Sequence, residues 1–170
     1  MLNINWEKKL AEQLPELTRY AMALTRNSDI AEDLIQDCLE RAWAKRALWN
    51  SQRKLRPWLF SIMHNLYIND ISRLANKQSF VDIDISDTQA VSEASNGMAL
   101  RDLDIALSKL SPEYREIILL AGLENLSYKE IAKITSLPLG TVMSRLSRAR
   151  EKLRKMMDGV DEDSVVVQLR

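Results

Sequence analysis

The stretch from Leu107 to Lys155 decides the fold, and it reads LSKLSPEYREIILLAGLENLSYKEIAKITSLPLGTVMSRLSRAREKLRK. Ser111, Pro112 and Glu113 are typical of a helix start. Serine caps free amides, proline fits the first turn, and an acid favours the positive end of the helix dipole. Apolar residues follow as far as Gly122, which can end the helix. The stretch therefore predicts a helix from Pro112 to Gly122.

Two further helices are predicted after Gly122. Ser127 and Glu130 form the pattern of a capping box, which opens a short helix. The residues Thr135–Pro138 force a turn, and a third helix follows from about Leu139 to Met157, with apolar residues at helical spacing. A helix, a short turn and a second helix with a basic outer face are the plan of a helix-turn-helix motif.

The last of these helices is strongly basic. Gly140–Lys155 carries six basic residues and one acidic residue, a net charge of +5. In a helix-turn-helix the second helix enters the major groove, with its N-terminal residues near base edges. An ordinary solvated helix is the alternative, but this density of positive charge favours DNA. The predicted DNA-binding residues are Thr141, Met143, Ser144, Arg145, Ser147 and Arg148, with Arg150 and Lys152 nearer the phosphates.

The rest of the chain divides into a second helical unit and two irregular segments. Helical spacing of apolar residues dominates residues 6–77, where Asp29 and Glu32 predict a helix N-terminus. Periodicity fades over residues 78–100, where the chain has four acids before Leu100 and no base, and Val81–Asp87 alternates without partner strands. The sequence therefore predicts an all-α protein with two small helical domains, 1–77 and 101–157. A flexible acidic linker, 78–100, joins them, and a tail, 158–170, follows.

The composition of the 170 residues excludes several classes of site. The chain has one cysteine, Cys38, and one histidine, His64, so it cannot form an internal disulfide, a multi-histidine metal site or an obvious catalytic triad. The longest stretch without charge, Pro57–Asn69, has 13 residues, fewer than the roughly 20 that cross a bilayer. We expect a cytoplasmic protein that is not an enzyme, inserts in no membrane, and needs no metal or cofactor.

Three segments resemble one family. Leu107–Lys155 resembles the fourth conserved region of bacterial extracytoplasmic-function (ECF) sigma factors. Asp29–Lys45, DIAEDLIQDCLERAWAK, resembles the polymerase-binding helix of their second region, and Leu55–Arg73, LRPWLFSIMHNLYINDISR, resembles the promoter-melting segment. The resemblance implies a sigma factor that binds core RNA polymerase and directs promoter-specific initiation. It also implies a response to stress and an anti-sigma factor that holds the protein inactive.

The resemblance also implies a polymerase-binding face. Its residues would be Asp33, Gln36, Asp37 and Glu40, facing a coiled coil of the largest polymerase subunit; the second-largest subunit is a further expected partner. Three of these, Asp33, Asp37 and Glu40, fall on one helical face by spacing alone. Without the resemblance, acids on an amphipathic helix would be interpreted as merely solvated.

The first domain is further implied to recognise the minus-10 element, where a base is flipped from the non-template strand, and the second domain the minus-35 duplex. Single-stranded bases are held by stacking surfaces beside a basic track, and the segment supplies both. The predicted minus-10 residues are Trp49, Arg53, Lys54, Arg56, Phe60 and Asn65. Trp58, Leu59 and Ile62 are expected in the core, and His64 in a polar surface role.

Two other functions remain open on the sequence. A stand-alone helix-turn-helix regulator would not need the single-strand apparatus of the first domain. A sigma-like mimic that only sequesters an anti-sigma factor would not need the six basic residues of Gly140–Lys155. The promoter sequence cannot be transferred from relatives, because Met143 and Ser147 stand where some members carry arginine or an aromatic residue.

Overall fold

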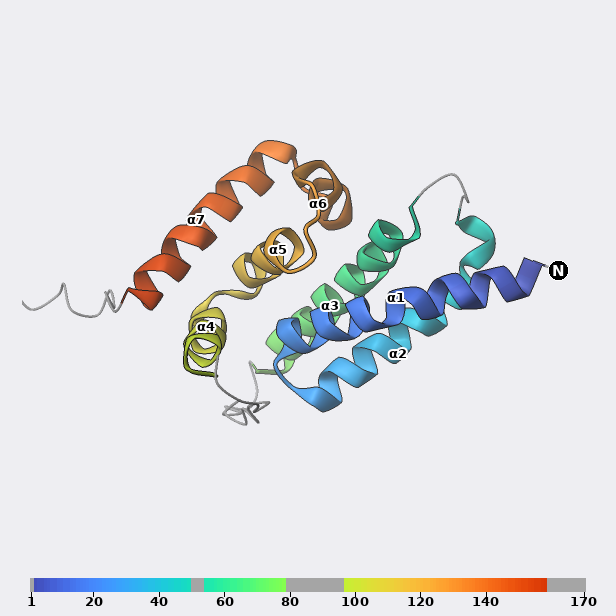
Figure 1. Cartoon of the computed structure of the whole chain (residues 1–170), viewed down its shortest axis with the longest axis horizontal. Helices are drawn as coiled ribbons and strands as arrows, with labels where there is room; N and C mark the ends of the chain where they lie inside the picture. The colour runs from blue at the N-terminus through green and yellow to red at the C-terminus, as the bar shows by residue number, and fades with distance from the viewer. Residues whose placement is uncertain (1, 50–53, 79–96, 159–170) are drawn as a thin grey trace, which may run out of the picture.

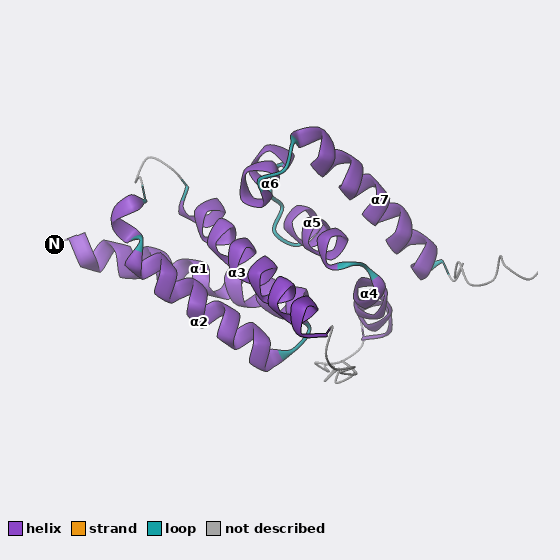
Figure 2. Cartoon of the chain, turned by 180° about the vertical axis from the view of Figure 1, so that it is seen from behind, coloured by secondary structure: helices purple, strands orange, loops and turns teal. Residues whose placement is uncertain are grey.

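The computed structural model describes residues 2–49, 54–78 and 97–158 (Figure 1). The predicted linker segment Val81–Asp87 lies outside the described residues, as do Arg53 and the tail from residue 159 onward. Within the described ranges the chain forms α-helices and one short 3-10 helix, without any strand (Figure 2). This confirms the predicted all-α fold class. None of the helices described is long and apolar enough to cross a membrane.

The first unit consists of helices α1 (Leu2–Thr25), α2 (Ser28–Ala44) and α3 (Leu55–Gln78), with the 3-10 helix η1 (Arg46–Leu48) between the last two. Helix α2 packs against both α1 and α3. At the centre the Tyr20 ring meets the Phe60 ring edge-on, with centroids 4.9 Å apart. Apolar side chains from all three helices surround this pair, so the unit has a continuous core.

The start of α2 differs from the prediction by two residues. Asn27, and not Asp29, is the N-cap, and its side-chain oxygen accepts a hydrogen bond from the Ile30 amide at 3.0 Å. The chain reverses just before this cap, where Arg26 has a left-handed φ of 57°. Asp29 instead lies in the first turn, where its carboxylate faces the positive end of the helix. An asparagine side chain caps a helix as well as an aspartate does, so Asn27 can take the N-cap position predicted for Asp29.

The second unit consists of α4 (Gly97–Lys109), α5 (Pro112–Gly122), α6 (Tyr128–Thr135) and α7 (Leu139–Met157). The bounds of α5 and α7 confirm the predicted ones. The capping box at Ser127 is also confirmed, with the Ser127 hydroxyl accepting from the Glu130 amide and the Glu130 carboxylate accepting in return. Helix α4 begins before Leu100, so residues 97–100 are helical and do not belong to the linker.

Helices α6 and α7 form the predicted helix-turn-helix. Ser136 ends α6 with a left-handed φ of 54°, and the Leu137 amide donates to the Ala132 carbonyl at 3.1 Å. Ile131 and Ile134 of α6 are buried, as are three residues of α7: Val142, Leu146 and Ala149. The apolar sides of both helices therefore face α5 and each other, and the opposite side of α7 is left to solvent.

The two units pack against one another. Helix α3 contacts α6, and α1 contacts α5, so α5 and α6 lie beside the first unit in both views (Figures 1 and 2). Buried apolar residues from both units form one cluster. The sequence predicted two independent units on a tether and did not predict this docked arrangement.

Candidate nucleic-acid interface

Helix α7 presents the residues that the sequence assigned to duplex DNA. Its buried side is apolar, and the predicted residues lie on the remaining sides: Met143, Ser144, Ser147, Arg148, Arg150 and Lys152 are exposed, and Thr141 and Arg145 are half-buried. Tyrosine side chains of the neighbouring helices contact the basic residues in the C-terminal half of α7. The Arg150 Nη1 donates to the Tyr128 hydroxyl at 3.3 Å, and the Lys152 ammonium lies 5.6 Å from the Tyr114 ring centroid. The set thus lies on the sides of α7 that are left outside the core, and most of its members are exposed.

The acidic residues of α2 form a second exposed surface. Asp33, Gln36, Asp37 and Glu40 are all exposed, and the Gln36 amide donates to Glu40 Oε1 at 3.1 Å. The opposite side of α2 is buried and carries Ala31, Leu34, Ile35, Cys38 and Ala42. This face is therefore free to contact another macromolecule without disturbing the core of the first unit.

The predicted minus-10 residues differ from one another in how exposed they are. Lys54 and Asn65 are exposed, and the Asn65 amide donates to the Ser61 carbonyl at 2.8 Å. Trp49 is half-buried, with its ring centroid 5.3 Å from that of Trp6. Phe60 differs from the expectation of an accessible ring: it is 1% exposed and packs against Tyr20, so the described structure leaves no room for a base on it.

Arg56 meets the second unit. Its Nη2 lies 2.6 Å from Glu124 Oε2, and its Nε pairs with Glu16 of its own unit. Arg19 of α1 reaches the same Glu124 carboxylate, with its Nη2 3.1 Å from Oε1 and 3.2 Å from Oε2. The Glu124 side chain is 0% exposed, whereas that of Arg19 is 52% exposed. Two guanidinium groups of the first unit thus converge on one buried carboxylate of the second.

In the other polar contacts between the units, the basic side chain again comes from the first unit and the carboxylate from the second. Arg26 makes a two-point contact with Asp104, at 3.1 and 2.7 Å, and Lys54 lies 3.6 Å from Glu130. His64 Nδ1 lies 2.6 Å from Glu116 Oε1, and the Glu116 side chain is 3% exposed. In each of these contacts between the described parts of the two units, the arginine, lysine or histidine belongs to the first unit and the carboxylate to the second.

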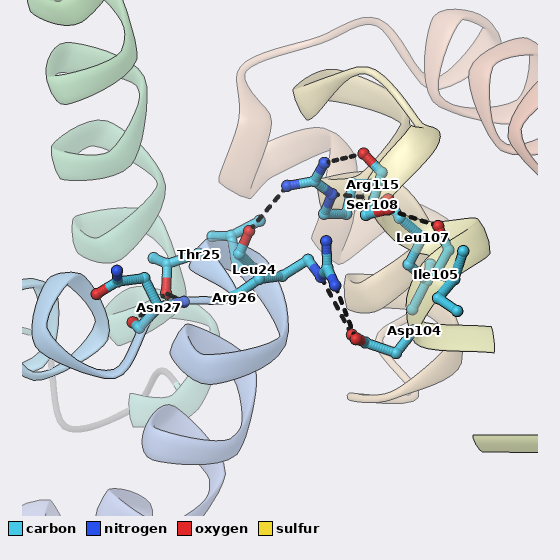
Figure 3. A network of polar contacts seen from close by, with 9 residues as sticks. All are labelled: Leu24, Thr25, Arg26, Asn27, Asp104, Ile105, Leu107, Ser108 and Arg115. Carbon is cyan, nitrogen blue, oxygen red and sulfur yellow. Dashed lines mark hydrogen bonds and ion pairs between the residues drawn. The ribbon is translucent and has the colours of Figure 1, made fainter. Parts of the chain in front are cut away.

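Arg115 ties the two units together through backbone carbonyls (Figure 3). Its guanidinium donates to Leu107 and Ser108 of α4, each at 2.9 Å, and to Leu110 at 3.1 Å. It also donates to the Leu24 carbonyl near the end of α1, at 3.3 Å. Arg115 thereby satisfies carbonyls that the end of α4 leaves without a helical partner.

The carboxylates of Glu116 and Glu124 are both buried where the two units meet. Burial raises the pKa of Tyr20 well above its ordinary value, and the charge of Glu116 adds to this effect. A buried carboxylate is tolerated only when it has a partner, which accounts for the two arginines at Glu124 and for His64 at Glu116. In the described part of the chain, no group of three or more acidic, histidine or cysteine side chains could hold a metal ion.

The sequence did not single out Arg19, Arg115, Glu116 or Glu124. For Glu116 a signal existed, because helical spacing places it on the same side of α5 as the buried Leu119 and Leu120. Glu124 follows the end of α5 and belongs to no periodic pattern. His64, expected in a polar surface role, has a side chain only 13% exposed.

Two family models match this chain, one in each unit. The family model "Sigma-70, region 4" matches residues 100–153, and the model "Sigma2 domain of PhyR" matches residues 10–64. The ECF RNA polymerase sigma factor EcfG of Rhodopseudomonas palustris is 32% identical over 154 residues, covering 88% of this chain and 84% of EcfG.

Two solved structures resemble most of the chain. The sigma factor RpoE, in complex with the anti-sigma factor NepR from Bartonella quintana, superposes with a TM-score of 0.81 at 34% identity. That match covers 91% of this chain and 97% of RpoE. The anti-anti-sigma factor PhyR, complexed with NepR from Bartonella quintana, superposes with a TM-score of 0.59 over 88% of this chain and 49% of PhyR. At 17% identity it shares the fold alone. On the identity to EcfG over most of both chains, this protein belongs to the ECF family of RNA polymerase sigma factors.

Proposed function

We propose that this sigma factor binds core RNA polymerase through α2 and recognises promoter DNA through both units. The first unit would contact the minus-10 element as a single strand, and the second the minus-35 element as a duplex. The observation that carries the proposal is α7, which buries its apolar side and exposes its polar and basic residues on a helix-turn-helix. Such a helix fits the major groove. The protein itself catalyses nothing and acts in the cytoplasm, where the polymerase is.

The proposal assigns each role to a domain. Residues 1–77 would bind polymerase and melt DNA, residues 101–157 would recognise the minus-35 element, and residues 78–100 would connect the two, followed by the tail 158–170. The extents of the two matching family models, 10–64 and 100–153, support this division. Residues 97–100 are the exception, because they are part of α4.

We also propose an anti-sigma factor as a partner. RpoE, which is 34% identical to this chain, was solved in complex with one, and its match to this chain includes both units. The docked arrangement of the two units is therefore a reasonable target for such a partner. Under this proposal, a stress signal would release the sigma factor from the anti-sigma factor.

A sigma-like mimic is the second candidate. The observation that favours it is the match of residues 10–64 to the model named for PhyR, because the solved PhyR is described as an anti-anti-sigma factor. A mimic needs to bind the anti-sigma factor, but neither polymerase nor DNA. The exposed basic side of α7 favours the sigma factor over the mimic.

Association with core polymerase tests the proposal. Asp37→Lys reverses a charge at an exposed position of α2, so we expect at least tenfold weaker co-purification with core enzyme, with the free energy of unfolding changed by less than about 0.5 kcal/mol. Glu12→Lys, which reverses an exposed charge on α1 and not on α2, is the matched control and should bind normally.

The two possible failures of this experiment are distinct. If the wild-type protein does not associate with core polymerase, the sigma-factor role is wrong and the mimic takes its place. If wild type and Asp37→Lys associate equally, the acidic residues of α2 are merely solvated. Far-ultraviolet circular dichroism of each variant shows whether the fold has been kept.

A further inference from the structure

Arg19, Arg56 and Glu124 make up the most completely built polar site outside the helix-turn-helix. Three nitrogen atoms of the two arginines lie between 2.6 and 3.3 Å from the two oxygens of the Glu124 carboxylate. The carboxylate is fully buried and comes from the second unit. Arg56 is among the residues assigned to single-stranded promoter DNA, whereas nothing assigns a role to Arg19.

We propose that Arg19 and Arg56 form a binding site for a backbone phosphate of single-stranded promoter DNA, and that Glu124 occupies this site while the units are docked. The proposal rests on the proposed function, because it places this site beside the minus-10 residues. It adds Arg19 to the DNA-binding set, and it makes docking of the second unit compete directly with the DNA.

The chemistry of the arginines supports the exchange. A guanidinium group donates two parallel N–H bonds to a carboxylate or to a phosphate in nearly the same geometry. Glu124 provides such an anion from within the protein, and a phosphodiester would provide it from outside. Because one set of donors cannot bind both anions at once, the DNA can enter only when Glu124 has left.

The remaining contacts between the units also engage basic residues of the first unit while the units are docked. Arg26, Lys54 and His64 of the first unit face Asp104, Glu130 and Glu116 of the second. Separation of the units would therefore uncover Arg26 and His64, and would leave Lys54, which is already exposed, without its carboxylate partner. Glu16 belongs to the first unit, so its pair with Arg56 persists and keeps this arginine oriented in either state.

Competition has a thermodynamic signature. If only the undocked fraction binds DNA, the apparent affinity is lowered by that fraction, and weakening the docked state raises it. By linkage, DNA must shift the protein towards the undocked state to the same extent. Both effects can be measured on the full-length protein without polymerase.

The first test uses Glu124→Gln, with Asp102→Asn as the matched control. Asp102 is an exposed acid of α4 that takes part in none of the contacts described above, so both variants lose one negative charge from the second unit. Fluorescence anisotropy reports binding to a short labelled single-stranded oligonucleotide, and small-angle X-ray scattering reports the radius of gyration. We expect Glu124→Gln to be more extended and to bind about tenfold more tightly, the factor typical of losing one charge-assisted contact. Asp102→Asn should resemble wild type in both measurements.

The second test concerns Arg19. In the Glu124→Gln background, Arg19→Gln should lose about tenfold in affinity for the oligonucleotide. Arg73→Gln, which removes an exposed arginine at the far end of α3, should lose clearly less. Equal losses would mean that Arg19 contributes only its net charge, which overturns the site.

Several results would overturn the proposal. The proposal is wrong if Glu124→Gln expands without binding DNA more tightly than Asp102→Asn, or if it shows neither change. If Glu124→Gln does not fold by circular dichroism, the wild-type protein provides the test. Small-angle neutron scattering with the DNA contrast-matched reports the radius of gyration of the protein alone, which saturating oligonucleotide should increase, and an unchanged radius contradicts competition. Co-purification of wild type with core polymerase is measured in parallel. Its failure would contradict the proposed function, whereas normal co-purification with unchanged oligonucleotide binding contradicts this inference alone.

Discussion

Cys38 illustrates how burial controls the reactivity of a single residue. It lies fully buried on α2, with its thiol 3.6 Å from the Leu59 carbonyl oxygen, and burial raises its pKa to about 12. The thiolate is the form that reacts with thiol reagents. We therefore expect Cys38 in the native protein to react much more slowly at pH 8 than in denaturing urea. Absorbance during reaction with a disulfide reagent measures both rates, and equally fast labelling of the native protein would contradict the described packing.

Single residues also show where sequence interpretation succeeds and where it does not. The buried position of Cys38 follows from its helical spacing with apolar residues. Phe60 was assigned to DNA because its segment resembles a DNA-binding one, yet its ring completes the core beside Tyr20. Spacing identifies the side of a helix, but a resemblance carries a role to a position without testing whether that side is exposed.

The capping box at the start of α6 should contribute measurably to the free energy of unfolding. Hydrogen bonds from the Ser127 backbone and hydroxyl lower the pKa of Glu130. Ser127→Ala should lower the free energy of unfolding by about 1 kcal/mol, the usual value of an N-cap. Urea denaturation at neutral pH measures this loss, and Ser72→Ala, at an exposed position within α3, is the control and should change it by less than about 0.5 kcal/mol.

The same capping box predicts a dependence on pH. A carboxyl whose pKa is lower in the folded than in the unfolded state contributes stability that is present above its unfolded pKa. That contribution is lost as the pH falls through the folded pKa. The difference between wild type and Ser127→Ala should therefore shrink in acid, below the ordinary pKa of glutamate. An equal difference at neutral and acidic pH would contradict a charged Glu130 in the capping box.

Helix α7 carries the prediction for duplex DNA. Arg148 is exposed on the side away from the core, so Arg148→Ala should weaken binding to a minus-35 duplex by about 1–3 kcal/mol if it contacts bases. Arg101→Ala, exposed on α4, is the control for loss of one positive charge. Electrophoretic mobility shifts on a promoter that the holoenzyme transcribes measure both. Equal binding by the two variants would remove Arg148 from the recognition surface.

Elements were largely predictable because their ends carry local signals. Ser111 with Pro112 and Ser127 with Glu130 mark the starts of α5 and α6, and the turn at Pro138 marks the start of α7. The start of α2 was misplaced because Asn27 and Asp29 are both good caps, and only the backbone at Arg26 decides between them. Local signals therefore fix an element's existence better than its first residue.

The docked arrangement exists only at the scale of the whole molecule, and the sequence did not predict it. Arg19 and Glu124 are separated by 105 positions in the chain. Each lies in a segment where a charged residue is normally solvated, and no local pattern indicates a distant partner. The site on α7 could be predicted because its chemistry lies within one helix, whereas the Arg19–Arg56–Glu124 site needs three separate segments brought together.

Transcription by the reconstituted holoenzyme tests the central claim most directly. Purified core RNA polymerase is mixed with the full-length protein and a panel of genomic promoter templates, and the run-off products are separated by size. The account predicts transcripts with defined 5′ ends from a subset of templates, and none from these start sites with core enzyme alone. If the protein binds core polymerase, yet no template gives a transcript above the core-only background, this chain does not direct promoter-specific initiation.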